Sequence, residues 1–218
     1  MKYCPKCNQP GDGAFCIHCG TQLFTTQDNL GMSSGTVLEG TLYTYQLQKV
    51  LGQGGFGITY RALNRERGEL VAVKEYFPVR SAVRAQDGTV QVKPGYEEEF
   101  KTGLESFSGE ARMLATMDKV PSVVQVMDQF QKRGTAYLVM EYRDGTPLHE
   151  KAARMGGKIP PEELLPKLPP LLRDLAVIHK LGVLHRDITP DNIMWMPDGT
   201  LKLLDFGSAR NVGGGNSM

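Results

Sequence analysis

All four cysteines of this 218-residue chain fall within its first 19 residues, as two Cys-x-x-Cys pairs separated by eight residues. Such a pair brings two thiolates onto one ion, and two pairs complete a tetrahedral zinc shell. Two disulfides or a redox pair are the alternatives, but no export signal or redox fold accompanies the cysteines. We therefore expect Cys4, Cys7, Cys16 and Cys19 to ligate a structural zinc ion, with His18 as a bystander.

A second candidate for chemistry is the stretch Gly52-Gln-Gly54-Gly-Phe-Gly57. Glycines let main-chain amides approach a polyphosphate closely, because no side chain stands in the way. Alone the pattern is weak, since a glycine-rich hairpin and a dinucleotide site both use it. A dinucleotide site needs a helix directly after the glycines, whereas Ile58-Thr59-Tyr60 favours a strand. After such a loop, Lys74 becomes a candidate to bind phosphate oxygens.

The elements around these residues can be predicted from periodicity. Apolar and polar residues alternate on both sides of the glycines, which predicts strand, loop, strand, and residues 69–74 predict a further strand. Residues 96–117 carry an apolar stripe at helical spacing: Phe100, Leu104, Phe107, Ala111 and Leu114. Glu110 falls at the edge of this stripe, from which an acid can reach a facing lysine.

The last third of the chain holds another ordered set of polar residues. A strand at 135–142 and a helix at 171–181, ending at Gly182, precede His185-Arg-Asp187. Asn192 follows five residues after Asp187. A hairpin then runs through 193–196, a turn at 197–199 and 201–204, and it delivers Asp205-Phe-Gly207.

Together these motifs resemble a protein kinase of the eukaryotic-like type over roughly residues 36–210. The shared order is a glycine-rich loop, Val-Ala-Val-Lys74, Glu110 on a helix, His-Arg-Asp-x-x-x-x-Asn192 and Asp-Phe-Gly207. Bacterial serine/threonine kinases are the nearest likeness, and the cysteine-rich start resembles the short zinc ribbons of many bacterial proteins. Small-molecule kinases of this fold usually carry glycine where this chain has Arg186.

The resemblance implies a mechanism that uses ATP and magnesium. The three glycines of the loop would fold over the triphosphate, and Lys74 would bind the inner phosphates while paired with Glu110. Asp187 would accept the proton of the substrate hydroxyl, and Asn192 and Asp205 would hold magnesium. The nucleotide-binding residues implied in full are Leu51, Gly52, Gly54, Gly57, Thr59, Ala72, Lys74, Met140, Glu141, Tyr142, Asn192 and Asp205.

Three features depart from the family pattern. Thr189 stands where serine/threonine kinases usually place a lysine that contacts the γ-phosphate. An insert at 75–99 separates Lys74 from its helix and contains the Asp87-Gly88 signal of a two-residue hairpin turn. It is either an exposed decoration or a regulatory contact surface. The chain also ends at Met218, so we expect an incomplete large lobe with exposed apolar faces that invite a partner.

Composition excludes several other functions. The 25 Lys+Arg against 24 Asp+Glu give a formal charge of +1, which argues against a nucleic-acid binder or a polybasic membrane anchor. No run approaches the roughly 18 apolar residues of a membrane helix. The N-terminus has no apolar stretch behind its one charge, so we expect a cytoplasmic protein.

We therefore expect an α+β protein with a kinase-like two-lobed fold and ATP bound between the lobes. A zinc ribbon at 1–24 and a linker at 25–35 would precede a kinase domain at 36–218, divided near residue 142. Its partners would be protein substrates with Ser/Thr hydroxyls and a protein that contacts the ribbon or the large lobe. The alternatives are a catalytically weak or inactive nucleotide-binding module or kinase fragment that acts through protein–protein contacts, and a zinc-ribbon adaptor.

Overall fold

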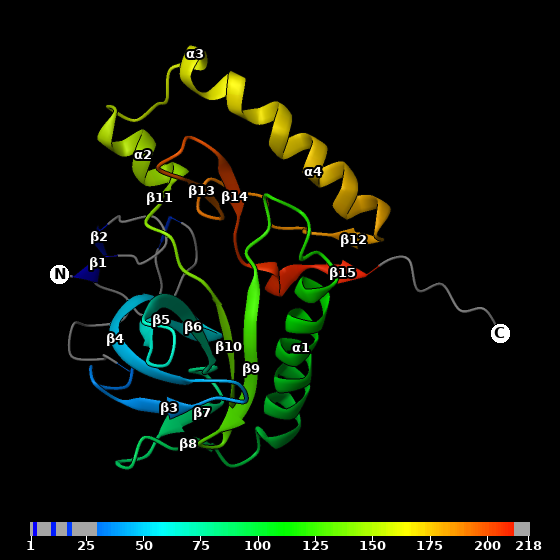
Figure 1. Cartoon of the computed structure of the whole chain (residues 1–218). Coiled ribbons are helices and arrows are strands. Elements are labelled where there is room, and N and C mark those ends of the chain that lie inside the picture. Colours follow the sequence, from blue (N-terminus) through cyan, green and yellow to red (C-terminus); the bar gives the residue numbers. More distant parts are fainter. Residues whose placement is uncertain (1, 4–9, 12–16, 19–29, 212–218) are drawn as a thin grey trace. The chain divides into compact units, whose positions relative to one another are not determined.

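The computed structural model describes residues 2–3, 10–11, 17–18 and 30–211. The chain divides into two compact units (Figure 1). The first unit comprises residues 1–108 and 127–142, and the second comprises residues 109–126 and 143–218. The α+β character expected from the sequence is confirmed, because a large sheet dominates the first unit and helices dominate the second.

The first unit is built on a six-stranded sheet whose strand order is β3-β4-β5-β6-β10-β9. The strands are β3 Val37–Glu39, β4 Thr44–Gln53, β5 Gly57–Asn64, β6 Glu69–Tyr76, β9 Val126–Lys132 and β10 Thr135–Glu141. Strands β4, β5, β6 and β10 pair antiparallel with their neighbours in turn. Arg133 and Gly134 join β9 to β10 with φ values of 51° and 73°, which suit a tight hairpin turn.

Alternating burial explains why these residues form a sheet with one packed face. In β5 every second side chain, from Ile58 to Asn64, is buried. Aromatic rings extend this core across the sheet, since Phe130 lies 6.1 Å from Tyr45 and 5.1 Å from Tyr137 between ring centroids. The strand predicted after the glycine-rich loop is therefore confirmed, and no helix follows the glycines.

Helix α1 spans Glu97–Ala115, beginning in the first unit and ending in the second. Three glutamates in its first turn suit the positive end of the helix dipole. Phe100 and Phe107 pack on Tyr76, with ring centroids 5.1 and 5.7 Å away. The predicted helix at 96–117 is thus confirmed within two residues at each end.

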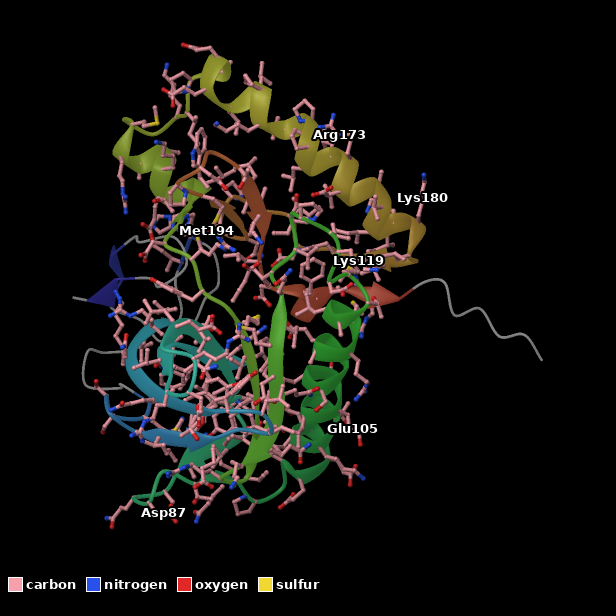
Figure 2. All side chains as sticks on the ribbon, viewed as in Figure 1. Asp87, Glu105, Lys119, Arg173, Lys180 and Met194 are labelled. Carbon is pink, nitrogen blue, oxygen red and sulfur yellow. The ribbon has the colours of Figure 1, made fainter. Side chains whose placement is uncertain are left out.

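The insert forms a separate hairpin of β7 Ala82–Arg84 and β8 Val90–Val92. The prediction of a two-residue Asp-Gly turn is wrong. The N–H of Ala85 donates to the carbonyl of Thr89 at 2.8 Å, so the loop holds three residues, with Gly88 left-handed at φ 84°. Asp87 stands at the loop's outer tip (Figure 2).

The second unit contains the helices α2 Leu148–Arg154, α3 Pro161–Leu164 and α4 Leu168–Lys180, and 3₁₀ turns at Leu165–Lys167 and Phe206–Ser208. A three-stranded sheet has the order β11-β13-β14, with β11 Thr146–Pro147, β13 Ile193–Trp195 and β14 Leu201–Leu203. Strand β12 Val183–Leu184 pairs with β15 Arg210–Asn211. The predicted hairpin at 193–204 is therefore confirmed.

Helix α4 shows two contrasting faces. Leu171, Leu175 and Ile178 are buried, whereas Leu172 and Val177 are 58% and 45% exposed, as expected for this helix. Arg173 and Lys180 also lie along it (Figure 2). The helix ends where predicted, with Gly182 left-handed at φ 78° directly after its C-cap.

The N-terminal segment contributes a short ladder of β1 Lys2–Tyr3 with β2 Pro10–Gly11. The four cysteines lie outside the described residues, so the expected zinc shell stays a prediction. Within the described residues no helix combines the length and apolar character that crossing a membrane requires.

Candidate active site

The glycine-rich loop joins β4 to β5 in the first unit. Apart from each glycine's own chain neighbours, no atom of the described residues lies within 4 Å of a Cβ built on Gly52, Gly54 or Gly55, and none of these glycines has a positive φ. Neither packing nor backbone conformation therefore requires glycine there. A Cβ on Gly57, by contrast, would lie 2.6 Å from the main-chain oxygen of Glu75. The first three glycines leave open the space that a phosphate chain would need.

Register places several expected binding residues on one face of the sheet. Thr59 pairs with Lys74 across β5 and β6, and Ala72 pairs with Met140 across β6 and β10. Side chains two apart on a strand share a face, so Thr59, Ala72, Lys74 and Met140 lie together. The ammonium nitrogen of Lys74 lies 5.8 Å from the centre of the Phe107 ring.

Three further expected residues lie at the margins of this sheet. Leu51 precedes the glycine-rich loop on β4 and is 40% exposed. Glu141 ends β10 and Tyr142 follows it, both half-buried. Glu110 is buried on α1 in the second unit, so its pairing with Lys74 of the first unit stays a prediction.

The second unit holds the polar residues of the 185–192 loop, which connects β12 to β13. His185 is buried, and its Nδ1 accepts the N–H of Asp187 at 3.3 Å. Its Nε2 therefore carries the proton and donates it to the carbonyl oxygen of Leu204 at 3.0 Å. His185 thus joins this loop to the strand end that delivers Asp205.

Asn192 fixes the conformation of Asp187. Its amide nitrogen donates to the main-chain oxygen of Asp187 at 3.0 Å and to the carboxylate Oδ2 at 2.8 Å. The amide oxygen of Asn192 is then the atom left to ligate a cation. The N–H of Leu204 donates to the carbonyl of Asn192 at 2.8 Å, which ties the same loop to the Asp205 segment a second time.

Asp205 and Arg186 hold left-handed backbone conformations, with φ 56° and 68°. Such values are uncommon for residues with a side chain and persist only where the surroundings enforce them. Asp205 accepts the N–H of Gly207 at 3.2 Å and caps the 3₁₀ turn that follows. Phe206 is buried against His185 at 4.5 Å between ring centroids.

Comparison with known proteins identifies this arrangement. The family described as "protein kinase domain" matches residues 45–218. The chain belongs to the protein kinase domain family. It is 34% identical over 173 residues to a probable serine/threonine-protein kinase of Streptomyces coelicolor, covering 78% of this chain and 23% of that one. It is 33% identical to the serine/threonine-protein kinase PknA of Mycobacterium tuberculosis, covering 77% and 36%.

A solved structure supports the same assignment. The structure titled "PpkA-294 apo form" matches 83% of this chain with a TM-score of 0.76 and 35% sequence identity. The chain covers 63% of that structure, and it spans well under half the length of the two bacterial relatives. The resemblance inferred from the motifs is thus confirmed at the level of a protein kinase domain with bacterial serine/threonine kinase relatives.

The kinase domain also contains features that sequence reasoning missed. The Nδ1 of His149 lies 2.8 Å from Oδ1 of Asp191 in the 185–192 loop. The main-chain N–H of His149 donates to the carbonyl of Pro190 at 3.2 Å. The hydroxyl oxygen of Thr189 is buried and has no hydrogen-bond partner among the residues that the structure describes. A buried ion pair of Glu75 with Arg84 lies in the first unit. No local sequence pattern predicts these contacts, because they join residues that are separated in sequence or depend on loop geometry.

Proposed function

We propose that this chain is the ATP- and magnesium-dependent phosphotransferase part of a serine/threonine protein kinase. The observation that carries the proposal is the double hydrogen bond from Asn192 to Asp187. It holds a carboxylate in one orientation beside an amide oxygen, as proton transfer and cation binding at one site require. Family membership and the serine/threonine kinase relatives support the same reaction.

Nucleotide binding is assigned to the first unit's sheet face and loop. The open glycines would admit the triphosphate to main-chain N–H groups, and Lys74 would pair with its inner phosphates. Ala72 and the main chain of Glu141 and Tyr142 would bracket the adenine. Leu51 and Thr59 flank the glycine-rich loop on β4 and β5 and would complete the pocket.

Phosphoryl transfer is assigned to the 185–192 loop and Asp205. Asp187 would accept the proton of a Ser/Thr hydroxyl on a protein substrate, in the orientation that Asn192 enforces. The donor set of Asn192 and Asp205 fits magnesium, which prefers oxygen ligands. When bound, magnesium neutralises charge that develops on the transferring phosphoryl group. Asp205, capped by the Gly207 N–H, offers its carboxylate from a fixed turn.

Transfer from γ-labelled ATP with magnesium tests the proposal, using the protein itself and a generic protein as acceptors. The wild type should label one or both, and Asp187→Asn should abolish the label while binding of nucleotide persists. Arg173→Gln, on the exposed surface of α4, is the matched control and should transfer at the wild-type rate. If the wild type showed no transfer and no saturable ATP binding, the proposal would be refuted.

A second candidate is a nucleotide-binding module with weak or no transfer, and Thr189 favours it. The family's usual lysine would add a positive charge near the γ-phosphate, whereas Thr189 supplies only a hydroxyl, which is buried. Loss of that charge weakens stabilisation of the transition state. Saturable magnesium-dependent ATP binding without transfer, in both wild type and Asp187→Asn, would favour the module.

We also propose that Cys4, Cys7, Cys16 and Cys19 bind one structural zinc ion and that this segment contacts a partner protein. Among the described residues, no group of three or more His, Cys, Asp or Glu side chains could hold a metal ion. The four cysteines lie outside the described residues. Support comes from the Cys-x-x-Cys spacing and from the pairing of Tyr3 with Pro10. Metal analysis should find one zinc per chain, lost in a Cys16→Ser/Cys19→Ser variant. Disulfides without metal would refute this.

A further inference from the structure

Glu75 follows Lys74 on β6 and points to the opposite face of the sheet, where its side chain is fully buried. Tyr60 donates its hydroxyl to Oε2 at 2.7 Å, and Tyr137 donates to Oε1 at 3.0 Å. Arg84 completes the shell with a bidentate pair, Nη1 to Oε1 at 3.0 Å and Nη2 to Oε2 at 2.7 Å. A buried carboxylate is tolerated only when paired and hydrogen-bonded, so Glu75 depends on Arg84.

Arg84 comes from the insert hairpin and connects three segments. Besides Glu75, its Nε donates to the carbonyl oxygen of Leu30 at 2.7 Å, and Nη1 donates to that of Gly88 at 3.1 Å. The N–H of Met32 donates to the Tyr60 hydroxyl at 3.1 Å, so residues 30–32 are bonded to this cluster a second time. The Arg84 side chain, only 12% exposed, therefore joins β6, the hairpin and Leu30.

The root of the insert is bonded to the glycine-rich loop. Beyond the end of β6, the N–H of Phe77 donates to the carbonyl of Phe56 at 3.0 Å, and that of Val79 donates to Gly55 at 3.2 Å. Phe77 is fully buried, and its ring centre lies 4.6 Å from the guanidinium carbon of Arg84. The segment that Arg84 anchors thus also holds two carbonyls at the tip of the loop.

These contacts give the insert a role that differs from both sequence-based alternatives, an exposed decoration and a regulatory contact surface. We propose that Arg84 is a positioning residue for nucleotide binding. Through Glu75, Phe77 and the insert it keeps the glycine-rich loop and the strand of Lys74 in the arrangement that receives the triphosphate. It acts through β6 and the loop and not by contact with phosphate. The inference rests on the proposed function, because it assumes that this face binds ATP.

A purely structural role would have a different signature. Removing Arg84 leaves Glu75 buried without its charge partner, which lowers stability whether or not Arg84 also positions the loop, so an unfolding temperature alone does not decide. A positioning role lowers the fraction of molecules whose loop is ready for nucleotide. Apparent affinity falls by that fraction, while turnover at saturating nucleotide changes little.

The deciding experiment compares Arg84→Met and Arg84→Lys with Arg67→Met in the full chain. Arg67 is the matched control, because its side chain is 52% exposed and pairs with Glu69 at 2.9 Å on the same unit. Direct titration with magnesium-ATP should show affinity about tenfold weaker for Arg84→Met and unchanged for Arg67→Met. Arg84→Lys, which keeps the charge but loses the bidentate pair, should lie between them.

Hydrogen exchange and steady-state kinetics complete the test. In Arg84→Met the amides of Phe77 and Val79 should exchange faster, and KM for ATP should rise while kcat falls less than about twofold. If Arg84→Met fails to fold, Glu75→Gln carries the same comparison with both partners still able to hydrogen-bond. Wild-type binding with unchanged affinity in the variants would overturn the inference. No binding by the wild type would instead overturn the proposed function.

Discussion

The amide of Asn192 binds Asp187 twice, at the main-chain oxygen and at the carboxylate. Two bonds from one amide to one residue restrict both the peptide plane and the side-chain rotamer of Asp187. The geometry gives Asn192 a role beside its proposed cation binding, because it orients the carboxylate that is proposed to accept the proton. His185 supports the same residue by accepting its main-chain N–H.

Replacing Asn192 should therefore lower the transfer rate by more than the loss of a proposed cation ligand alone would. We expect Asn192→Ala to lower the transfer rate at least about 100-fold, because a misdirected base forfeits its contribution. Stability should fall by only about 1 kcal/mol for the lost hydrogen bonds. Initial rates and urea midpoints measure the two effects.

Asn192→Asp separates the two roles, since it keeps an oxygen ligand and loses the donor. Its carboxylate would face that of Asp187, and like charges raise a carboxyl pKa. The acid limb of the pH–rate profile should move to higher pH in this variant. A profile and rate equal to the wild type would show that the donated hydrogen bonds do not position Asp187.

Two glycines of α1 should respond in opposite ways to replacement by alanine. A Cβ on Gly103 would collide with the hydroxyl of Tyr76, whereas on Gly109 it would meet only the Arg112 guanidinium, 3.8 Å away. Gly103→Ala should cost about 1–3 kcal/mol through overpacking. Gly109→Ala should stabilise by about 0.5–1 kcal/mol, because glycine is a poor helix former.

Thermal or urea unfolding of the two variants checks this pair directly. The Tyr76→Phe background provides a further control, because it removes the oxygen that the new methyl would meet. Gly103→Ala should cost less there than in the wild type. Equal effects of the two alanines on unfolding would contradict the close packing of α1 on Tyr76.

Thr189 offers a test of charge at the transfer site. We expect Thr189→Lys to raise the transfer rate about tenfold, equal to about 1.4 kcal/mol of transition-state stabilisation. ATP affinity in the absence of transfer should change far less. Single-turnover kinetics with excess enzyme measure the step.

Thr189→Val is the isosteric control for that experiment. Within the described part of the chain the Thr189 hydroxyl oxygen is buried without a hydrogen-bond partner, so its removal should leave stability unchanged or slightly higher. The transfer rate should also stay unchanged. A large loss of rate in Thr189→Val would mean that the hydroxyl itself contributes to transfer.

The sequence predicted those parts of the site that depend on local pattern. The run at 69–74 placed Lys74 on a strand and the apolar stripe of α1 placed Glu110 on a helix, and both assignments are confirmed. The conformation of Asp205 was beyond reach, because a left-handed φ is enforced by the surrounding fold. The turn at Asp87-Gly88 was predicted one residue too short. The hydrogen bond from Ala85 to Thr89 that closes the loop leaves three residues between them, and the Asp-Gly pair alone does not reveal that bond.

The Glu75–Arg84 pair shows why the remainder could not be predicted. Both side chains read as ordinary solvated charges on a strand and a hairpin, and nine positions separate them. Only the folding of the insert over the sheet buries them together with two tyrosines. Local propensities contain no signal for such a pairing, whereas the cost of a buried unpaired charge makes it specific once formed.

The tyrosines around Glu75 predict a loss of stability at alkaline pH. Burial, then the negative charge and hydrogen bond of Glu75, raise the pKa of Tyr60 and Tyr137 far above the usual value, although Arg84 opposes this. Burial and the charge of Glu99 raise the pKa of Tyr76 to about 12. In the unfolded chain tyrosines ionise near pH 10, so above this pH the unfolded state binds fewer protons and is favoured.

The urea midpoint should fall steadily from about pH 9.5 upward, and Tyr60→Phe should make that fall shallower. An equal slope in Tyr60→Phe and wild type would show that Tyr60 ionises alike in both states.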